Sequence, residues 1–205
     1  IVINELDALA NIDFETREVK GTHRQLSMVR IGTSGALQPE LIVGTPVIAE
    51  KAIGFDGVLN YYAGRNEVAD LEFEKAFCEH TGWNPLWAKP YVVDAHNELV
   101  AQIGRDDMVR GNTISAVGFY GPQGRELRLP LANPDLNSRI ESFRFNGKKV
   151  TNYEMESAPL QGLSRLMGHR AMTVCSIIAN RMRHDATPNY KTAIRDLIAT
   201  VLDRI

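Results

Sequence analysis

The sequence lacks a long hydrophobic run, since apolar stretches such as residues 172–179 fall far short of the roughly 20 residues that span a bilayer. It has only two cysteines, Cys78 and Cys175, without CxxC spacing, which favours free thiols in a reducing compartment over a disulfide scaffold. The formal net charge of -2 provides no long-range attraction to nucleic acid or to an anionic membrane. We therefore expect a cytoplasmic protein that binds neither nucleic acid nor membranes.

The five histidines form no HxxxH or HExxH pattern, so we expect no metal site. The 205 residues include 44% hydrophobic and 23% charged residues, which is typical of a globular protein, and we expect a single domain over 1–205. Residues 1–10 contain an apolar-periodic run with no initiator Met, signal peptide or capping residue ahead of it. We therefore expect an N-terminal portion to precede residue 1.

Short strand-like segments alternate with segments of helical periodicity along the chain. The expected strands are 26–32, 45–54, 89–96, 112–120, the start of 149–168, and 170–181. The expected helices are 1–12, 67–82, the rest of 149–168, and 189–205, and the expected polar connector is 185–189. This alternation predicts a layered α/β domain with helices on both faces of a largely parallel sheet. Ligands of such domains bind beyond the carboxyl ends of the strands.

An arginine and a hydroxyl-rich segment follow the first predicted strand. Arg30 lies near the expected strand end, and the predicted turn after it contains Gly32, Thr33, Ser34 and Gly35. Glycines allow backbone N–H groups to converge, hydroxyls add donors, and arginine supplies a bidentate fork, so the segment suits a phosphate. It is not a GxxxxGK[ST] loop, so it does not indicate a nucleoside triphosphate. The alternative is a turn with a purely structural role.

The stretch GFYGPQGREL combines an aromatic platform with two polar side chains that can recognise a flat heterocycle. Phe119 can stack on such a ring. The Gln123 amide offers both an acceptor and donors, and Arg125 donates to a second carbonyl, which together complement the edge of uracil or thymine. The alternative is a surface turn with a solvated arginine and a phenylalanine in the core.

The stretch NYEMES places two carboxylates one residue apart, where a strand passes into a helix. A carboxylate such as Glu156 can accept two charge-assisted hydrogen bonds from a cis-diol, and Met155 can pack on the apolar face of a sugar. An acid/base pair of Glu154 and Glu156 is less favoured, because neighbouring residues do not straddle a scissile bond. The alternative is a solvated helix start.

The motifs RIGTSGALQPELIVGT, FYGPQGR, TNYEMESA and SIIANR together resemble, in order and spacing, the uridine phosphorylases of the nucleoside phosphorylase family. The resemblance covers the whole chain. It implies the phosphorylase/hydrolase-like fold, a three-layer α/β/α arrangement around a central mixed, largely parallel sheet. It also implies cleavage of uridine by phosphate to uracil and ribose 1-phosphate. Phosphate is then a co-substrate, no metal or organic cofactor is expected, and the enzyme is a dimer or hexamer of identical subunits.

The resemblance further implies roles for individual residues. The phosphate-binding or catalytic residues are expected to be Arg30, Thr33 and Arg125. The nucleoside-binding residues are expected to be Ser34, Gly35, Phe119, Gln123, Arg125, Glu154, Met155, Glu156, Ile178, Ala179 and Arg181. Within this set, Glu156 is expected on the ribose 2′ and 3′ hydroxyls, and Ile178 with Ala179 along the pyrimidine.

Two differences from related proteins bear on the expected function. Purine-specific relatives place a Ser-Asp pair where this chain reads Ala179, Asn180 and Arg181, so the absence of that acid favours a pyrimidine. The family's glycine-rich phosphate loop, and the arginine and histidine given by a neighbouring subunit, belong before residue 1. The alternatives are a purine nucleoside phosphorylase, a hydrolytic nucleosidase of the same fold, and a nucleoside-binding protein without catalysis.

Overall fold

The computed structural model describes residues 1–187 and 189–205. Its strands are β1 (Ser27–Ala36), β2 (Pro46–Gly54), β3 (Tyr91–Asp94), β4 (Val109–Ser115), β5 (Arg144–Phe145), β6 (Lys148–Glu154), β7 (Arg170–Asn180) and β8 (Asp185–Ala186). Its α-helices are α1 (Val2–Asn11), α2 (Arg65–Val68), α3 (Leu71–Thr81), α4 (Asn97–Gly104), α5 (Leu136–Ser142), α6 (Ser157–Leu166) and α7 (Lys191–Leu202). Two 3-10 helices are η1 (Val58–Tyr61) and η2 (Gly121–Gln123).

The described strands form one eight-stranded sheet in the order β3-β2-β4-β6-β1-β7-β8, with β5 paired to β6. The pairs β1–β7, β2–β4 and β4–β6 are parallel, whereas β2–β3, β1–β6 and β7–β8 are antiparallel. A further antiparallel pairing of β2 with β7 joins strands that lie apart in this order, so part of the sheet closes on itself. The predicted mixed sheet is confirmed.

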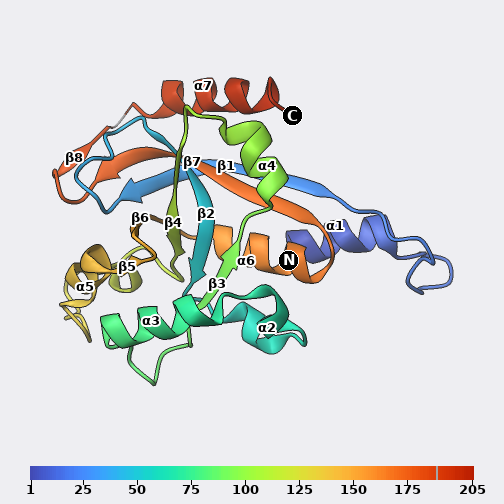
Figure 1. Ribbon diagram of the computed structural model, residues 1–205, viewed down its shortest axis with the longest axis horizontal. Helices are drawn as coiled ribbons and strands as arrows, with labels where there is room; N and C mark the ends of the chain where they lie inside the picture. The colour runs from blue at the N-terminus through green and yellow to red at the C-terminus, as the bar shows by residue number, and fades with distance from the viewer. Residues whose placement is uncertain (188) are drawn as a thin grey trace.

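Helices cover both faces of the sheet, with α4 and α7 above it and α3 and α5 below it in Figure 1. Phe73 and Phe77 of α3 pack with Ile140 of α5 in one buried cluster against the strands. Leu99 of α4 and Leu197 of α7 belong to a second buried cluster. Burial of these apolar side chains is the main driving force for folding, and it holds the sheet between two helical layers as predicted.

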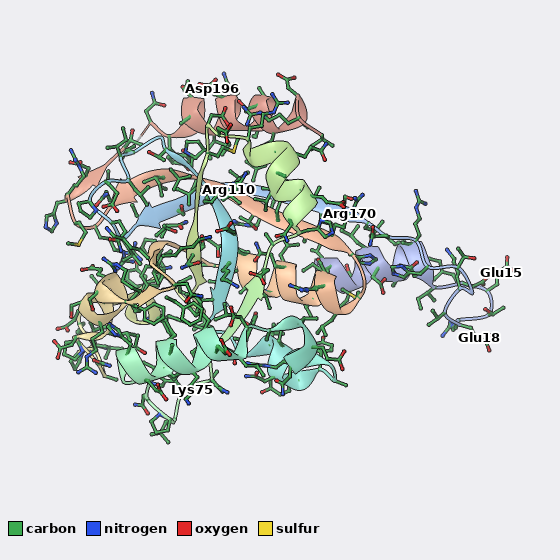
Figure 2. All side chains as sticks on the ribbon, viewed as in Figure 1. Glu15, Glu18, Lys75, Arg110, Arg170 and Asp196 are labelled. Atoms are coloured by element: carbon green, nitrogen blue, oxygen red, sulfur yellow. The ribbon has the colours of Figure 1, made fainter. Side chains whose placement is uncertain are left out.

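The N-terminal segment projects from the body of the domain. Helix α1 contacts α6, and the chain that follows α1 extends outward to the right in Figure 1. Figure 2 shows the exposed Glu15 and Glu18 at the tip of this extension, far from the sheet. The extension therefore leaves the central strands free to form the candidate site.

Two predicted boundaries differ from the structure around the sheet. The predicted turn that contains Gly32 and Gly35 lies inside β1, because a ten-residue parallel ladder with β7 keeps this segment extended to Ala36. The strand predicted over 112–120 begins earlier and ends at Ser115, ahead of η2. Arg30 is therefore in the middle of a strand rather than near its end.

The helices differ from the prediction mainly where their sequence signal is short. Helix α3 lies within the predicted range 67–82 and ends where expected, because Gly82 adopts the left-handed conformation that ends a helix. It begins later than predicted, since the Asp70 side chain accepts from the backbone N–H of Phe73 and caps the helix there. The short helices α4 and α5 were not predicted. The predicted connector 185–189 contains β8, and its residue 188 lies outside the described residues.

Candidate active site

A partly buried arginine is the centre of the first group of site residues. Arg30 on β1 pairs through Nη1 with Oε2 of Glu154 at 3.1 Å, and through Nη2 with Oε2 of Glu156. Nη1 also donates to Sγ of Cys175 on β7 at 3.3 Å. A Cβ built on Gly32 would lie 2.8 Å from the Arg30 guanidinium, so this glycine leaves the space that the side chain occupies. Two strand motifs far apart in sequence thus meet at one cation.

The segment from Thr33 to Gly35 contributes strand residues. Thr33 is half-buried, and the Ser34 hydroxyl is buried without a hydrogen-bond partner among the described residues. Ser34 pairs with Ile177, but Gly35 pairs with Ala179, so the β7 residue between them is bulged out of the ladder. A β-bulge re-aims the side chains beside it. Ile178 and Ala179 are both half-buried at this bulge, as a pocket lining requires.

A glutamine held by two arginines is the centre of the second group. Oε1 of Gln123 accepts from Nη1 of Arg125 at 2.6 Å and from Nη2 of Arg181 at 2.9 Å. Nη1 of Arg181 also donates to the Gln123 carbonyl. The Gln123 side chain is thereby oriented with its oxygen toward the arginines, which leaves its amide N–H groups as donors for another molecule.

The predicted aromatic platform is partly covered. The guanidinium carbon of Arg125 lies 3.8 Å from the centroid of the Phe119 ring, and its Nη1 donates to the Phe119 carbonyl at 2.6 Å. Phe119 is otherwise exposed. A base therefore stacks on the covered face of this ring only after Arg125 turns away from it.

The two groups are connected through β6 and β1. The Arg181 guanidinium lies over the ring of Tyr153, 4.8 Å from the ring centroid, and Tyr153 directly precedes Glu154 in the sequence. Tyr153 pairs with Gly35 across the sheet. Gly32 lies beneath the Arg30 guanidinium, and Gly35 follows it three residues later along β1. Because this strand is extended, the two glycines lie about 10 Å apart. A ribose and a base in a row fit such a span.

Burial sets the pKa values of the charged groups in these two clusters. Burial, together with the positive charge of Arg125, lowers the pKa of Arg181 to about 10. Burial also raises the pKa of Glu154, while the Ser115 hydroxyl and the charge of Arg30 counteract it. The Cys175 thiol has its pKa raised to about 12, again chiefly by burial. Cys175 is therefore a neutral hydrogen-bond partner at neutral pH.

Sequence reasoning missed several supporting residues of the site. Oγ of Ser115 donates to Oε1 of Glu154 at 2.5 Å, and Asn137 bridges the Gln123 carbonyl and the Tyr153 hydroxyl at 3.1 and 2.9 Å. These side chains belong to no recognisable motif, and their partners are distant in sequence. Only the pairing of β4 with β6, and of α5 with its neighbours, brings them to the site.

A cavity of about 820 Å³ lies beside the second group. It is lined largely by apolar side chains, among them Trp83, Trp87 and Leu136, and it shares Arg125 with the candidate base site. Neither Arg30 nor Glu156 lines it. The cavity and the Arg30 cluster are thus different features of the molecule.

A cluster of Asp7, His23 and His169 was not foreseen, because the three residues have no metal-ligand spacing. Their possible ligand atoms lie within 4.8 Å of one another. The backbone N–H of Leu26 donates to Nδ1 of His169 at 3.2 Å, so Nε2 carries the proton and donates to Oδ1 of Asp7 at 3.0 Å. This arrangement ties α1 to the start of β7 and does not favour a metal ion.

None of the described helices is long and apolar enough to cross a membrane.

The comparisons with known proteins support the resemblance seen in the motifs. Residues 10–203 match the family model described as the phosphorylase superfamily. A uridine phosphorylase of Thermococcus kodakarensis is 33% identical over 168 residues, which are 78% of this chain and 50% of that protein. A uridine phosphorylase of Escherichia coli is 30% identical over 173 residues, 81% of this chain and 58% of that protein.

A solved structure of similar fold is a nucleoside phosphorylase of Trypanosoma brucei, whose structure report ascribes uridine phosphorylase activity to it. The TM-score is 0.82 at 23% identity, over 99% of this chain and 76% of that one. This likeness shows the fold. The chain spans only about half the length of the two uridine phosphorylases named above. Because the family model covers nearly all of its residues, the chain belongs to the phosphorylase superfamily.

Proposed function

We propose that the full-length protein cleaves uridine with phosphate, giving uracil and ribose 1-phosphate in pyrimidine salvage. The observation that carries this proposal is the alignment of two groups along β1 and β7. Arg30 and Glu156 can take an anion and a diol at one end, and Gln123, fixed by Arg125 and Arg181, can take a base edge at the other. The names of the matched relatives support the same reaction.

At the sugar end, the nucleoside diol engages Glu156 while phosphate takes the edge of Arg30 that Glu156 occupies in the structure. Thr33, further along β1, adds a hydroxyl donor to the phosphate. Phosphate then lies below the ribose, where its charge stabilises the cation-like sugar as the bond from C1′ to N1 breaks. Phosphate also attacks C1′, so no side chain has to act as nucleophile. Holding both reactants together supplies the entropic part of the acceleration.

At the base end, negative charge moves onto the uracil carbonyls as the base departs. The free amide N–H groups of Gln123 donate to one carbonyl, and Arg125 donates to the other once it leaves the ring of Phe119. Arg181 keeps hold of Oε1 of Gln123 throughout, so the amide does not rotate. Donors oriented in advance toward developing charge are the efficient way to stabilise a leaving anion.

A purine reaction is the nearest alternative, and Asn180 counts against it. Its Nδ2 donates to the carbonyls of Gln38 and Leu41, at 2.9 and 2.7 Å, and its Oδ1 accepts from the backbone N–H groups of Met182 and Arg183. This buried amide fixes the end of β7 and supplies no proton. Arg181, next to it, is a cation with no acidic function at neutral pH. Neither Asn180 nor Arg181 therefore offers an acid to a purine ring nitrogen.

The test is a nucleoside panel of uridine, thymidine and inosine, given to the full-length protein with and without phosphate. We expect release of uracil from uridine only in the presence of phosphate. Preference for inosine would establish the purine reaction, and free ribose without phosphate would establish a nucleosidase. Calorimetric binding of uridine without turnover would identify a binding protein. Light scattering of the same preparation tests the expected dimer or hexamer, in which a neighbouring subunit completes the site.

A further inference from the structure

Glu154 has no free oxygen with which to bind a substrate. Its side chain is 1% exposed. Oε1 accepts from Oγ of Ser115 at 2.5 Å and from the backbone N–H of Ser157 at 3.1 Å. Oε2 accepts from the backbone N–H groups of Glu156 and Ser157, each at 2.9 Å, and pairs with Arg30. A carboxylate offers about four lone-pair positions, and these contacts use all of them.

The same contacts give the two edges of the Arg30 guanidinium different surroundings. Nη1 faces the interior, where it contacts the buried Glu154 carboxylate and the buried Cys175 thiol. Nη2 faces Glu156, whose side chain is 54% exposed. One edge of the fork is therefore fixed by buried partners, and the other is held only by a carboxylate that solvent and ligands can reach.

We propose that Glu154 is a positioning residue that fixes Arg30 so that its outer edge faces the phosphate site. Ser115 and the first backbone N–H groups of α6 hold the carboxylate in place, and the carboxylate holds Nη1. This role differs from the substrate contact that the family resemblance implied for Glu154. It rests on the proposed function of Arg30 as a phosphate ligand.

The first experiment is Glu154→Gln in the full-length protein, which keeps the size of the side chain and removes its charge. A neutral amide holds Arg30 loosely, and a small displacement of a positioning group costs up to about 100-fold in rate. We expect kcat/KM for phosphate to fall by about 10- to 100-fold, while KM for uridine changes by less than about threefold. A rise in the uridine KM with unchanged phosphate kinetics would make Glu154 a ribose ligand and overturn the proposal.

A double-mutant cycle separates positioning from general structural support. If Glu154 acts through Arg30, Glu154→Gln has no further effect on phosphate kinetics in an Arg30→Ala background, because the group that it positions is gone. Equal losses in both backgrounds would refute the proposal. Glu156→Gln is the matched comparison, since it removes the outer partner of the same guanidinium, and we expect it to raise mainly the uridine KM.

Ser115→Ala decides the matter if Glu154→Gln fails to fold. It keeps the charge of Glu154 but removes the hydroxyl that orients Oε1, so we expect a loss in kcat/KM for phosphate that again vanishes in the Arg30→Ala background. An unchanged kcat/KM in a folded Ser115→Ala protein would count against the proposal.

Calorimetry with inorganic phosphate alone keeps this test apart from the proposed function. If the wild-type protein binds phosphate but does not cleave uridine, the proposed function is refuted. The effect of Glu154→Gln on phosphate affinity then still tests the positioning role. Uridine phosphorolysis that is insensitive to both Glu154→Gln and Ser115→Ala would uphold the function and refute the positioning role. Protein that neither binds phosphate nor cleaves uridine would refute both.

Discussion

Replacement of Arg125 by alanine tests the base end of the site, because the structure separates its effect on activity from its effect on stability. Arg125 donates to Oε1 of Gln123 and to the Phe119 carbonyl, and it stacks on the Phe119 ring. When it is removed, Arg181 still donates to Oε1 of Gln123, so the buried acceptor keeps a partner. The Phe119 carbonyl bond is exposed, so water can replace it.

The two effects of Arg125→Ala are therefore expected to differ in size. Because Arg125 is only partly buried, solvent screening reduces its contribution, and the free energy of unfolding should fall by about 1 kcal/mol or less. Loss of a donor oriented toward developing charge typically costs about 2.7 to 4 kcal/mol, so kcat/KM for uridine should fall by about 100- to 1000-fold.

The assay is phosphate-dependent uracil release, with thermal unfolding of the same samples. The exposed Arg128, three residues along the same segment, provides the matched control as Arg128→Ala, which we expect to leave uridine kinetics unchanged. If Arg125→Ala retains kcat/KM within about twofold of the parent protein, the guanidinium does not act on the base. The same conclusion would follow if folded Arg125→Ala lost no more kcat/KM for uridine than Arg128→Ala does.

Three further changes test the phosphate end, the core and the buried thiol. A Cβ at Gly32 would meet the Arg30 guanidinium, so Gly32→Ala should lower kcat/KM for phosphate by about tenfold while thermal stability is maintained. Unchanged phosphate kinetics would contradict this placement of Arg30. A Cβ at Gly54 would lie 2.3 Å from the buried Tyr91 ring, so Gly54→Ala should destabilise the fold by about 1–3 kcal/mol in a urea titration; an unchanged midpoint would argue against this packing. Cys175 should resist iodoacetamide in the native protein and react after denaturation, because the thiol is buried and its pKa is about 12. Rapid labelling of this residue in the native protein would refute its burial.

Local sequence patterns were enough to predict much of the architecture. The helical pattern over 67–82, closed by Gly82, predicts α3, although the helix itself begins at Leu71. The alternation of such segments with β-branched runs predicts the layered α/β domain with a largely parallel sheet. These signals are readable because each arises from residues within a turn or two of one another. The short α4 and α5 carry too few residues for a periodic signal, and they were missed.

The tertiary structure decided how the motif residues are used. The glycine and hydroxyl segment from Gly32 to Gly35 is a strand because β7, about 140 residues later, pairs with it along its length. Gln123 is oriented by Arg181 through a bond between residues 58 positions apart.

The sequence alone thus determined the types of the longer elements and the order of the motifs, and it predicted the chemical classes of the candidate ligands. Only the tertiary structure decided that Glu154 is enclosed by Ser115, Arg30 and the start of α6, and that Arg125 covers Phe119. The physical reason is that local conformation follows from neighbouring residues, whereas the partner and burial of a polar side chain depend on strands and helices that meet only in the folded chain.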